Sequence, residues 1–187
     1  MPLLLPTLLF ALASGGAFPF AGTLSQTSPR LTLPENPCEV LTREQMATIT
    51  DLDVIAVRRA ASIGKVVQAQ RENRAPGAGT ICIYETQSAF GAISLFVPRR
   101  TTRTADAYWA ARSQYFETYP GAARSIPGVG MDAWLAGGAD LHVLVRGNDY
   151  FVVSAQMYPL PPGQAHELFV RCGELLAKIA TAIVARY

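Results

Sequence analysis

The sequence predicts an α+β fold: a single domain in which helices pack on an antiparallel sheet of about five or six strands. Two observations carry this prediction. Strand-like apolar runs come in pairs separated by short turns, which is typical of antiparallel hairpins, and segments with helical periodicity precede, separate and follow these pairs. The length of 187 residues suits one domain, and a hydrophobic content of 50% excludes wholesale disorder.

The N-terminal stretch has the pattern of an export signal. No charged side chain precedes Arg30, and the run from Leu3 to Ala13 has the length of a signal-peptide h-region, with small residues after it. A membrane-spanning helix needs roughly 20 continuous apolar residues, and several prolines interrupt this stretch. The pattern therefore favours a cleaved signal peptide, with an uncleaved anchor as the alternative.

The chain is expected to have three parts. Residues 1–22 form the signal peptide or anchor, residues 23–36 form a polar linker punctuated by prolines, and residues 37–187 form the domain. A domain of about 150 residues can bury roughly 70% of the surface of its unfolded chain, which is enough for one core. We therefore expect an exported protein, periplasmic or extracellular, with proximity to a membrane through the N-terminal segment only if that segment is retained.

A capping box predicts the start of the first helix. Thr42 and Gln45 stand at the N-cap and N3 positions, and this spacing predicts a short helix over Arg43–Ile49. The following stretch, Asp51–Gln70, is harder to interpret because it mixes strand-forming valines with residues that could extend a helix. We place a strand near Lys65–Gln70.

A first hairpin follows the turn signal of residues 76–79. Residues Thr80–Thr86 alternate, and Ala92–Val97 offers a second strand that ends at Pro98. Thr104 then caps a helix that runs to about Tyr119, with aromatic residues repeating on one face.

A second hairpin closes the sheet. Ala133–Ala136 is a short strand, and Leu141–Val145 and Tyr150–Met157 flank a four-residue turn. Both faces of these strands are apolar, which predicts that both faces are covered. The last helix, from about Gln164 to Ala185, has an apolar stripe at helical spacing.

Composition and motifs point away from several functions. The net charge of +2 gives no electrostatic case for binding nucleic acid. The sequence Gly128–Ala133 matches the letters of a dinucleotide fingerprint but lacks the strand before it and the helix after it, so we interpret it as a turn. His142 and His166 have no metal-ligand spacing, and Cys172 on an apolar stripe would be a poor nucleophile beside His166. We therefore expect no cofactor, no metal site and no catalytic residue.

Two features could contact a ligand. Arginines cluster at Arg99, Arg100 and Arg103, and again at Arg58 and Arg59, and the planar guanidinium matches a carboxylate. The simplest interpretation of both clusters is a solvated loop, and the alternative is contact with an anionic ligand or an acidic partner.

The second feature is the aromatic face of the predicted helix over 104–119. Tyr108, Trp109 and Arg112 could line a pocket or partner site, although such a stripe is most simply core.

The chain also resembles a known group. Residues 37–44, Pro-Cys-Glu-Val-Leu-Thr-Arg-Glu, resemble the opening of small exported bacterial proteins, many of them actinobacterial lipoproteins of unknown function. Cys82-Ile83-Tyr84 and Val129–Ala133 resemble two later motifs of that group. The resemblance implies a disulfide between Cys38 and Cys82 and a PsbP-like α/β/α sandwich. It supplies no activity, and this chain lacks the lipidated cysteine.

The third cysteine, Cys172, has no counterpart in those motifs. It shares its predicted helical stripe with leucines and isoleucines, so we expect a reduced thiol in the core. Pairing of Cys38 with Cys172, or no disulfide at all, are the alternatives.

Taken together, these features predict an exported, non-catalytic binding or protein-interaction module whose partner is a protein or a small ligand. The alternatives are an enzyme whose active site is dispersed in the sequence and a secreted protein inhibitor. A pocket with converging titratable groups would favour the enzyme, and a rigid exposed loop with aromatic anchors would favour the inhibitor.

Overall fold

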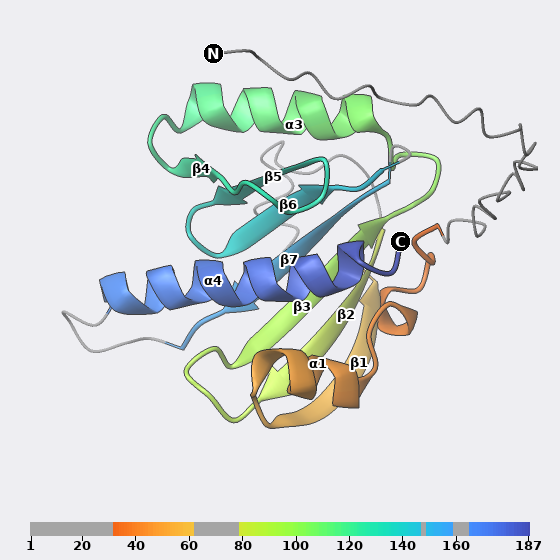
Figure 1. Ribbon diagram of the computed structural model, residues 1–187, viewed down its shortest axis with the longest axis vertical. Coiled ribbons are helices and arrows are strands. Elements are labelled where there is room, and N and C mark those ends of the chain that lie inside the picture. Colours follow the sequence, from red (N-terminus) through yellow and green to blue (C-terminus); the bar gives the residue numbers. More distant parts are fainter. Residues whose placement is uncertain (1–31, 62–78, 147–148, 159–164) are drawn as a thin grey trace, which may run out of the picture.

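The computed structural model describes residues 32–61, 79–146, 149–158 and 165–187, and it is an α+β domain built on one antiparallel sheet (Figure 1). The sheet has seven strands in the order β1-β2-β3-β7-β6-β5-β4. The strands are β1 (Val54–Ala61), β2 (Gly79–Thr86), β3 (Ala92–Pro98), β4 (Ala123–Ser125), β5 (Asp132–Ala136), β6 (Asp140–Leu144) and β7 (Tyr150–Gln156). The helices are the 3-10 turn η1 (Pro37–Glu39), α1 (Arg43–Thr50), α3 (Ala105–Thr118) and α4 (Ala165–Val184).

The predicted fold class is confirmed, but the strand count of five or six is too low. Two of the seven strands were not predicted, and both are edges of the sheet. The alternation of β1 is broken by a bulge between Val54 and Ala56, and β4 has only three residues, none of them buried. Neither strand therefore shows the regular apolar pattern that marks a central strand. The strand expected near Lys65–Gln70 lies outside the described residues.

The predicted helix starts agree closely with the structure. Thr42 accepts a hydrogen bond from the backbone N–H of Gln45, and the Gln45 side chain accepts one from the backbone N–H of Thr42, which completes the capping box of α1. The Thr104 hydroxyl caps α3 by accepting from the backbone N–H of Ala107. These side chains satisfy backbone donors that the first helical turn leaves unpaired.

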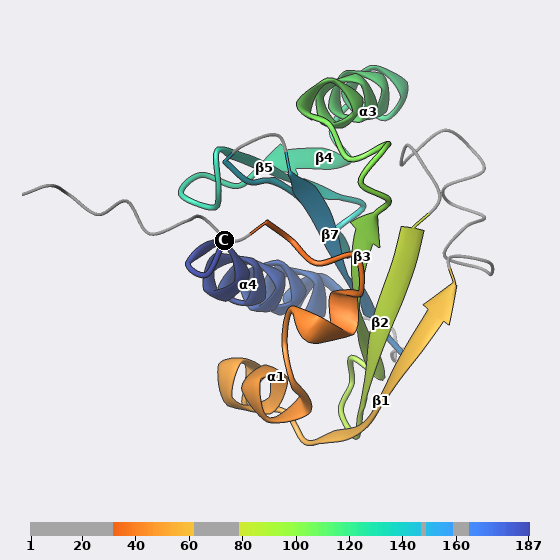
Figure 2. The same ribbon diagram turned by 90° about the vertical axis from the view of Figure 1, so that its right-hand side faces the viewer.

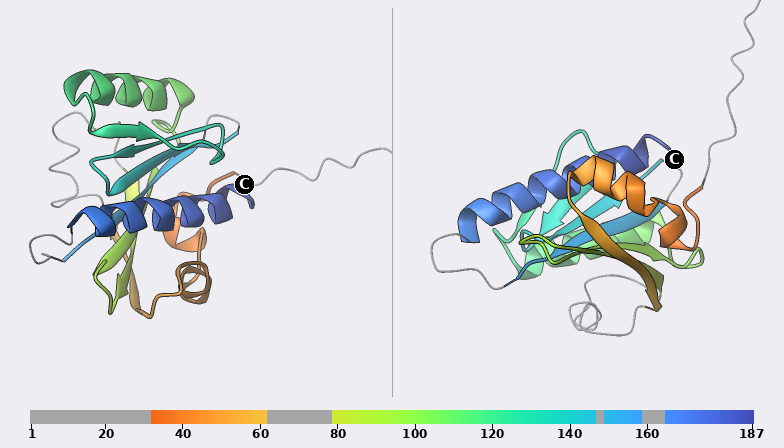
Figure 3. Two further views of the ribbon diagram at one scale, coloured as in Figure 1. Left: turned by 60° about the vertical axis from the view of Figure 1, so that its left-hand side comes forward. Right: turned by 90° about the horizontal axis from the view of Figure 1, so that it is seen from below.

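Helices cover both faces of the sheet, which explains why the central strands are apolar on both faces. Helices α1 and α4 pack on one face, and α3 packs on the other face over the half formed by β4–β7 (Figure 2). Figure 3 shows α3 and α4 on opposite sides of these strands. Each strand divides its side chains between the two cores. Leu141 and Val143 of β6 face α4, whereas Leu144 faces α3.

The sheet consists of two meanders joined side by side. Strands β1–β3 form the first, strands β4–β7 form the second, and β3 pairs with β7 in the middle, with Leu95 opposite Val153. The packed part of the chain includes Leu33, which is only 2% exposed although it belongs to the stretch expected to be a linker. The N-terminal arm before η1 is therefore held against the domain at Leu33.

Candidate anion-binding site

The candidate site is a surface pocket of about 440 Å³ at one end of the first meander, where β2 begins and β3 ends. Its walls come from the N-terminal arm, from β1–β3 and from the turn after β3. Among the described residues that line it, three are arginines and one is a glutamate; these residues are Glu35, Arg59, Thr80, Val97, Arg99, Arg100 and Thr101. The pocket therefore joins residues from segments that are far apart in the sequence.

Arg59 reaches the pocket because of its register on β1. It lies directly opposite Cys82 of β2, and opposed residues of an antiparallel pair point to the same face of the sheet. Cys82 lies in the core under α1 and α4, so Arg59 belongs to that face as well. Its neighbour Arg58 points to the other face, where its Nε lies 2.6 Å from the carboxylate of Glu85. The two arginines of the predicted Arg58–Arg59 cluster therefore lie on opposite faces of the sheet.

Arg99 and Arg100 lie on the turn that follows β3, and backbone hydrogen bonds hold this turn. The Arg99 carbonyl accepts hydrogen bonds from the backbone N–H groups of Thr102 and Arg103. Arg103 does not belong to the pocket, because its side chain is buried and its Nε lies 3.0 Å from Oδ1 of Asp149. This buried ion pair anchors the end of the turn, and the two exposed arginines before it are left at the pocket.

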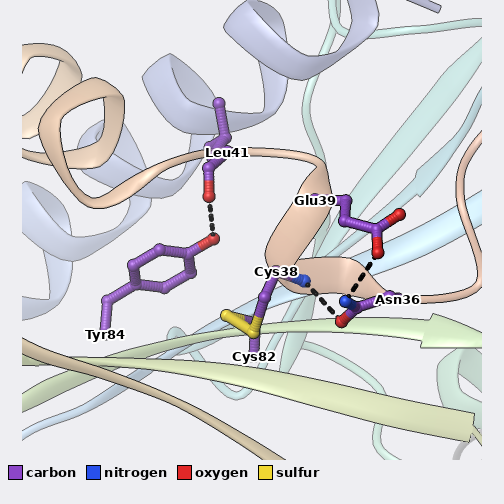
Figure 4. Close-up of a disulfide and its surroundings, with 6 residues drawn as sticks. All are labelled: Asn36, Cys38, Glu39, Leu41, Cys82 and Tyr84. Atoms are coloured by element: carbon purple, nitrogen blue, oxygen red, sulfur yellow. Dashed lines mark hydrogen bonds between the residues drawn. A yellow bond between two sulfur atoms is a disulfide. The ribbon is translucent and has the colours of Figure 1, made fainter.

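Glu35 is held on the N-terminal arm between two anchors. On one side, the backbone N–H of Leu33 donates to the carboxylate of Asp149, the same group that pairs with Arg103. On the other side, Asn36 caps η1 by accepting from the backbone N–H of Cys38 (Figure 4).

The disulfide between Cys38 and Cys82 fixes the arm to β2, as the resemblance implied. The two Cα atoms are 5.0 Å apart, within the ordinary range for a disulfide. Close by, the hydroxyl of Tyr84 donates to the carbonyl of Leu41 at 2.8 Å (Figure 4). Cys172 is a buried free thiol, as expected, and burial raises its pKa to about 11. It is therefore neutral and inert at ordinary pH.

The charged side chains that line the pocket have no ion-pair partner among the described residues. Within the part of the chain that the structure describes, neither Glu35 nor any of the three lining arginines forms an ion pair. A second surface pocket of about 300 Å³ contains Arg58 and Glu85, but these two pair with each other. Of these two pockets, the first therefore has arginines without an ion-pair partner among the described residues.

The predicted contact residues Tyr108, Trp109 and Arg112 do not line this pocket. Tyr108 is buried, its hydroxyl donates to Oδ2 of Asp132 at 2.7 Å, and burial raises its pKa above the ordinary value. The guanidinium of Arg112 lies over the rings of Trp109 and Phe116 and 3.3 Å from Asp132. Most of this aromatic face is therefore structural, although Trp109 remains 41% exposed.

The remaining motifs have structural roles. His142 is buried and stacks on Trp134 of the adjacent strand, with ring centroids 4.0 Å apart. The glycine motif at 128–133 spans the end of the turn between β4 and β5 and the first two residues of β5, and Gly128 and Gly130 in the turn have positive φ angles. Across the described ranges, no group of three or more His, Cys, Asp or Glu side chains could hold a metal ion.

Comparisons with protein-family models, with curated proteins and with solved structures found no significant match. The resemblance to small exported proteins therefore depends on the quoted motifs alone. Among the described residues, no helix has the length and apolar character needed to cross a membrane.

Proposed function

We propose that this protein is an exported, non-catalytic binding module whose pocket takes a carboxylate-bearing ligand. The observation that carries the proposal is the convergence of Arg59, Arg99 and Arg100, from two separate segments, on one pocket without an ion-pair partner among the described residues. Guanidinium groups present forked N–H donors that match carboxylates, and charge-assisted hydrogen bonds of this kind are among the stronger ones.

The size and the chemistry of the pocket favour binding over catalysis. Its volume of about 440 Å³ lies within the range of small-molecule sites. Among the described residues, a single carboxylate, that of Glu35, accompanies the arginines, and the hydroxyl groups of Thr80 and Thr101 form no hydrogen bond with it. These residues therefore do not form the hydrogen-bonded nucleophile and base by which a dispersed active site would be recognised.

Export is supported by two features. The uncharged N-terminal stretch has the pattern of a signal peptide. The disulfide between Cys38 and Cys82 suits an oxidising compartment, because disulfides are rare in reducing cytosol.

Titration calorimetry with citrate, at physiological ionic strength, tests the proposed binding. The double variant Arg59→Gln/Arg99→Gln should bind citrate at least about ten-fold more weakly, because it removes two charged contacts of roughly 1 kcal/mol each. Arg171→Gln is the matched control, since Arg171 is an exposed arginine of α4 outside the pocket. Equal weakening by the control, or no citrate binding by the unaltered protein, would contradict the proposal.

A further inference from the structure

We propose that the pocket selects dipolar ligands, amino-dicarboxylates, whose ammonium group is received by Glu35 while the arginines hold the carboxylates. This inference rests on the proposed function and names its ligand class. Among the described lining residues, Glu35 is the one whose charge is opposite to that of the arginines.

Glu35 does not neutralise the arginines. The pocket brings it together with Arg59, Arg99 and Arg100, yet none of the three has a side-chain nitrogen within 4.0 Å of its carboxylate. The positive and negative groups are therefore separated within one cavity. A ligand that bridges them needs charges of both signs.

The backbone that carries Glu35 is held by anchors on both sides. Two residues before it, Leu33 is buried and bonded to Asp149, and three residues after it, Cys38 is bonded covalently to β2. The arm between these anchors has little freedom to move, so the Glu35 carboxylate changes its position only by rotation of its own exposed side chain. A fixed backbone contributes to selectivity, because only this side chain has to be ordered when a ligand binds.

The balance of charge defines the ligand further. Among the described lining residues, three guanidinium groups accompany one carboxylate, and this set complements a molecule with at least two negative groups and one positive group. Glutamate fits this description and suits a cavity of about 440 Å³. Glutarate has the same carbon chain and both carboxylates but lacks the ammonium group, which makes it the matched comparison.

Titration calorimetry with L-glutamate and glutarate at pH 7 tests the inference. The net charge of the pocket alone would favour glutarate, which carries the larger negative charge. We expect the opposite order, with glutamate binding about three-fold more tightly, which is the effect of one exposed ion pair. In Glu35→Gln the order should reverse, because glutamate loses its partner and glutarate loses a repulsion.

The control is Glu39→Gln, which removes an exposed carboxylate of η1 that bonds to Asn36 and does not line the pocket. This variant should keep the preference for glutamate. Because the readout is a ratio of two affinities in the same variant, a small loss of folded protein does not change it.

Equal binding of the two ligands, a preference for glutarate, or a ratio that Glu35→Gln leaves unchanged would overturn the inference. The proposed function would stand in each of these cases if Arg59→Gln/Arg99→Gln still weakened citrate binding. If citrate binds and neither five-carbon ligand does, only the inference fails. If no anion binds at all, both fail.

Discussion

His142 shows how burial controls a single ionisable side chain. The residue lies on β6 within the layer that faces α3, and its ring is nearly parallel to that of Trp134, with an interplanar angle of 8°. Burial lowers the pKa of His142 to about 3, because the charged form would lose its hydration. The side chain is therefore neutral and serves as a flat packing element.

This shift predicts a pH dependence of stability. The folded pKa lies below the unfolded value of about 6.5, so below that pH the unfolded chain binds a proton that the folded protein does not bind. The contribution of neutral His142 to the free energy of unfolding is complete above pH 6.5 and is lost as the pH falls toward 3. Urea unfolding at pH 7 and pH 4.5 should show the loss, with a share on the order of 2 kcal/mol from this residue.

His142→Phe is the comparison that isolates this share. The variant keeps an aromatic ring on Trp134 but does not titrate, so it should lose less stability than the unaltered protein between the two pH values. All other titratable groups are the same in the two proteins, so their contribution cancels in the comparison. Identical losses would show that His142 can be protonated within the fold.

At the scale of the element, α4 is the helix with the strongest apolar stripe. Cys172, Leu176, Ile179 and Ile183 are all fully buried and lie against the face of the sheet that α1 also covers. The spacing of these residues places them on one side of the helix. The stability of this layer thus depends on residues from one end of α4 to the other.

Replacing Leu176 with Ala should lower the free energy of unfolding by about 2–5 kcal/mol, because it removes buried methyl groups and leaves a cavity. Denaturant unfolding measures the change. The control is Glu174→Ala at an exposed position of the same helix, for which we expect a change below about 0.5 kcal/mol. A loss below that value for Leu176→Ala would show that this stripe does not form the core.

On the scale of the whole molecule, the Cys38–Cys82 disulfide joins the N-terminal elements to the sheet. It closes a loop with a sequence separation of 44 residues, and it holds one wall of the candidate site. We expect non-reducing peptide mapping to find this cross-link and to find Cys172 unmodified. A cross-linked peptide that contains Cys172 would contradict the pairing.

Removing the cross-link should destabilise the domain. In the chain-entropy model, a loop of this size contributes roughly 4 kcal/mol, and Cys38→Ala/Cys82→Ala should lose about that amount in denaturant unfolding. Cys172→Ala is the matched control, because it deletes a thiol without changing the connectivity of the chain. Similar losses in the two proteins would show that packing of the sulfur atoms, and not the cross-link, is what stabilises the fold.

Sequence patterns predicted those elements whose formation depends on residues that are close together in the chain. The capping box at Thr42 and the paired runs around the two hairpins depend on neighbours in the sequence, and each was predicted within a few residues. The edge strands β1 and β4 were missed, since an edge strand lacks a continuous apolar face and is defined by the strand beside it.

The site was predicted only in part, for a related reason. The arginine clusters were recognised, but alternation along β1 and burial of Arg103 select which members reach the pocket, and both depend on tertiary structure. Glu35 lies in a stretch that was expected to be a linker, and its local sequence gives no indication that it lines a pocket. Arg59 lies in the same pocket as Arg99 and Arg100 only because of the order of the strands in the sheet.

The contacts of the chain's last residues have a consequence for the kinetics of folding. The guanidinium of Arg186 donates to the carbonyl of Val40 and to the side chain of Gln45, across a sequence separation of 146 and 141 residues. Contacts between such distant residues form only after a large entropic cost of loop closure, so chains rich in them fold slowly. During synthesis or translocation, η1 and α1 therefore form their final contacts only after nearly the entire polypeptide has emerged. A truncated nascent chain leaves the apolar side of α1 open to solvent or to a chaperone.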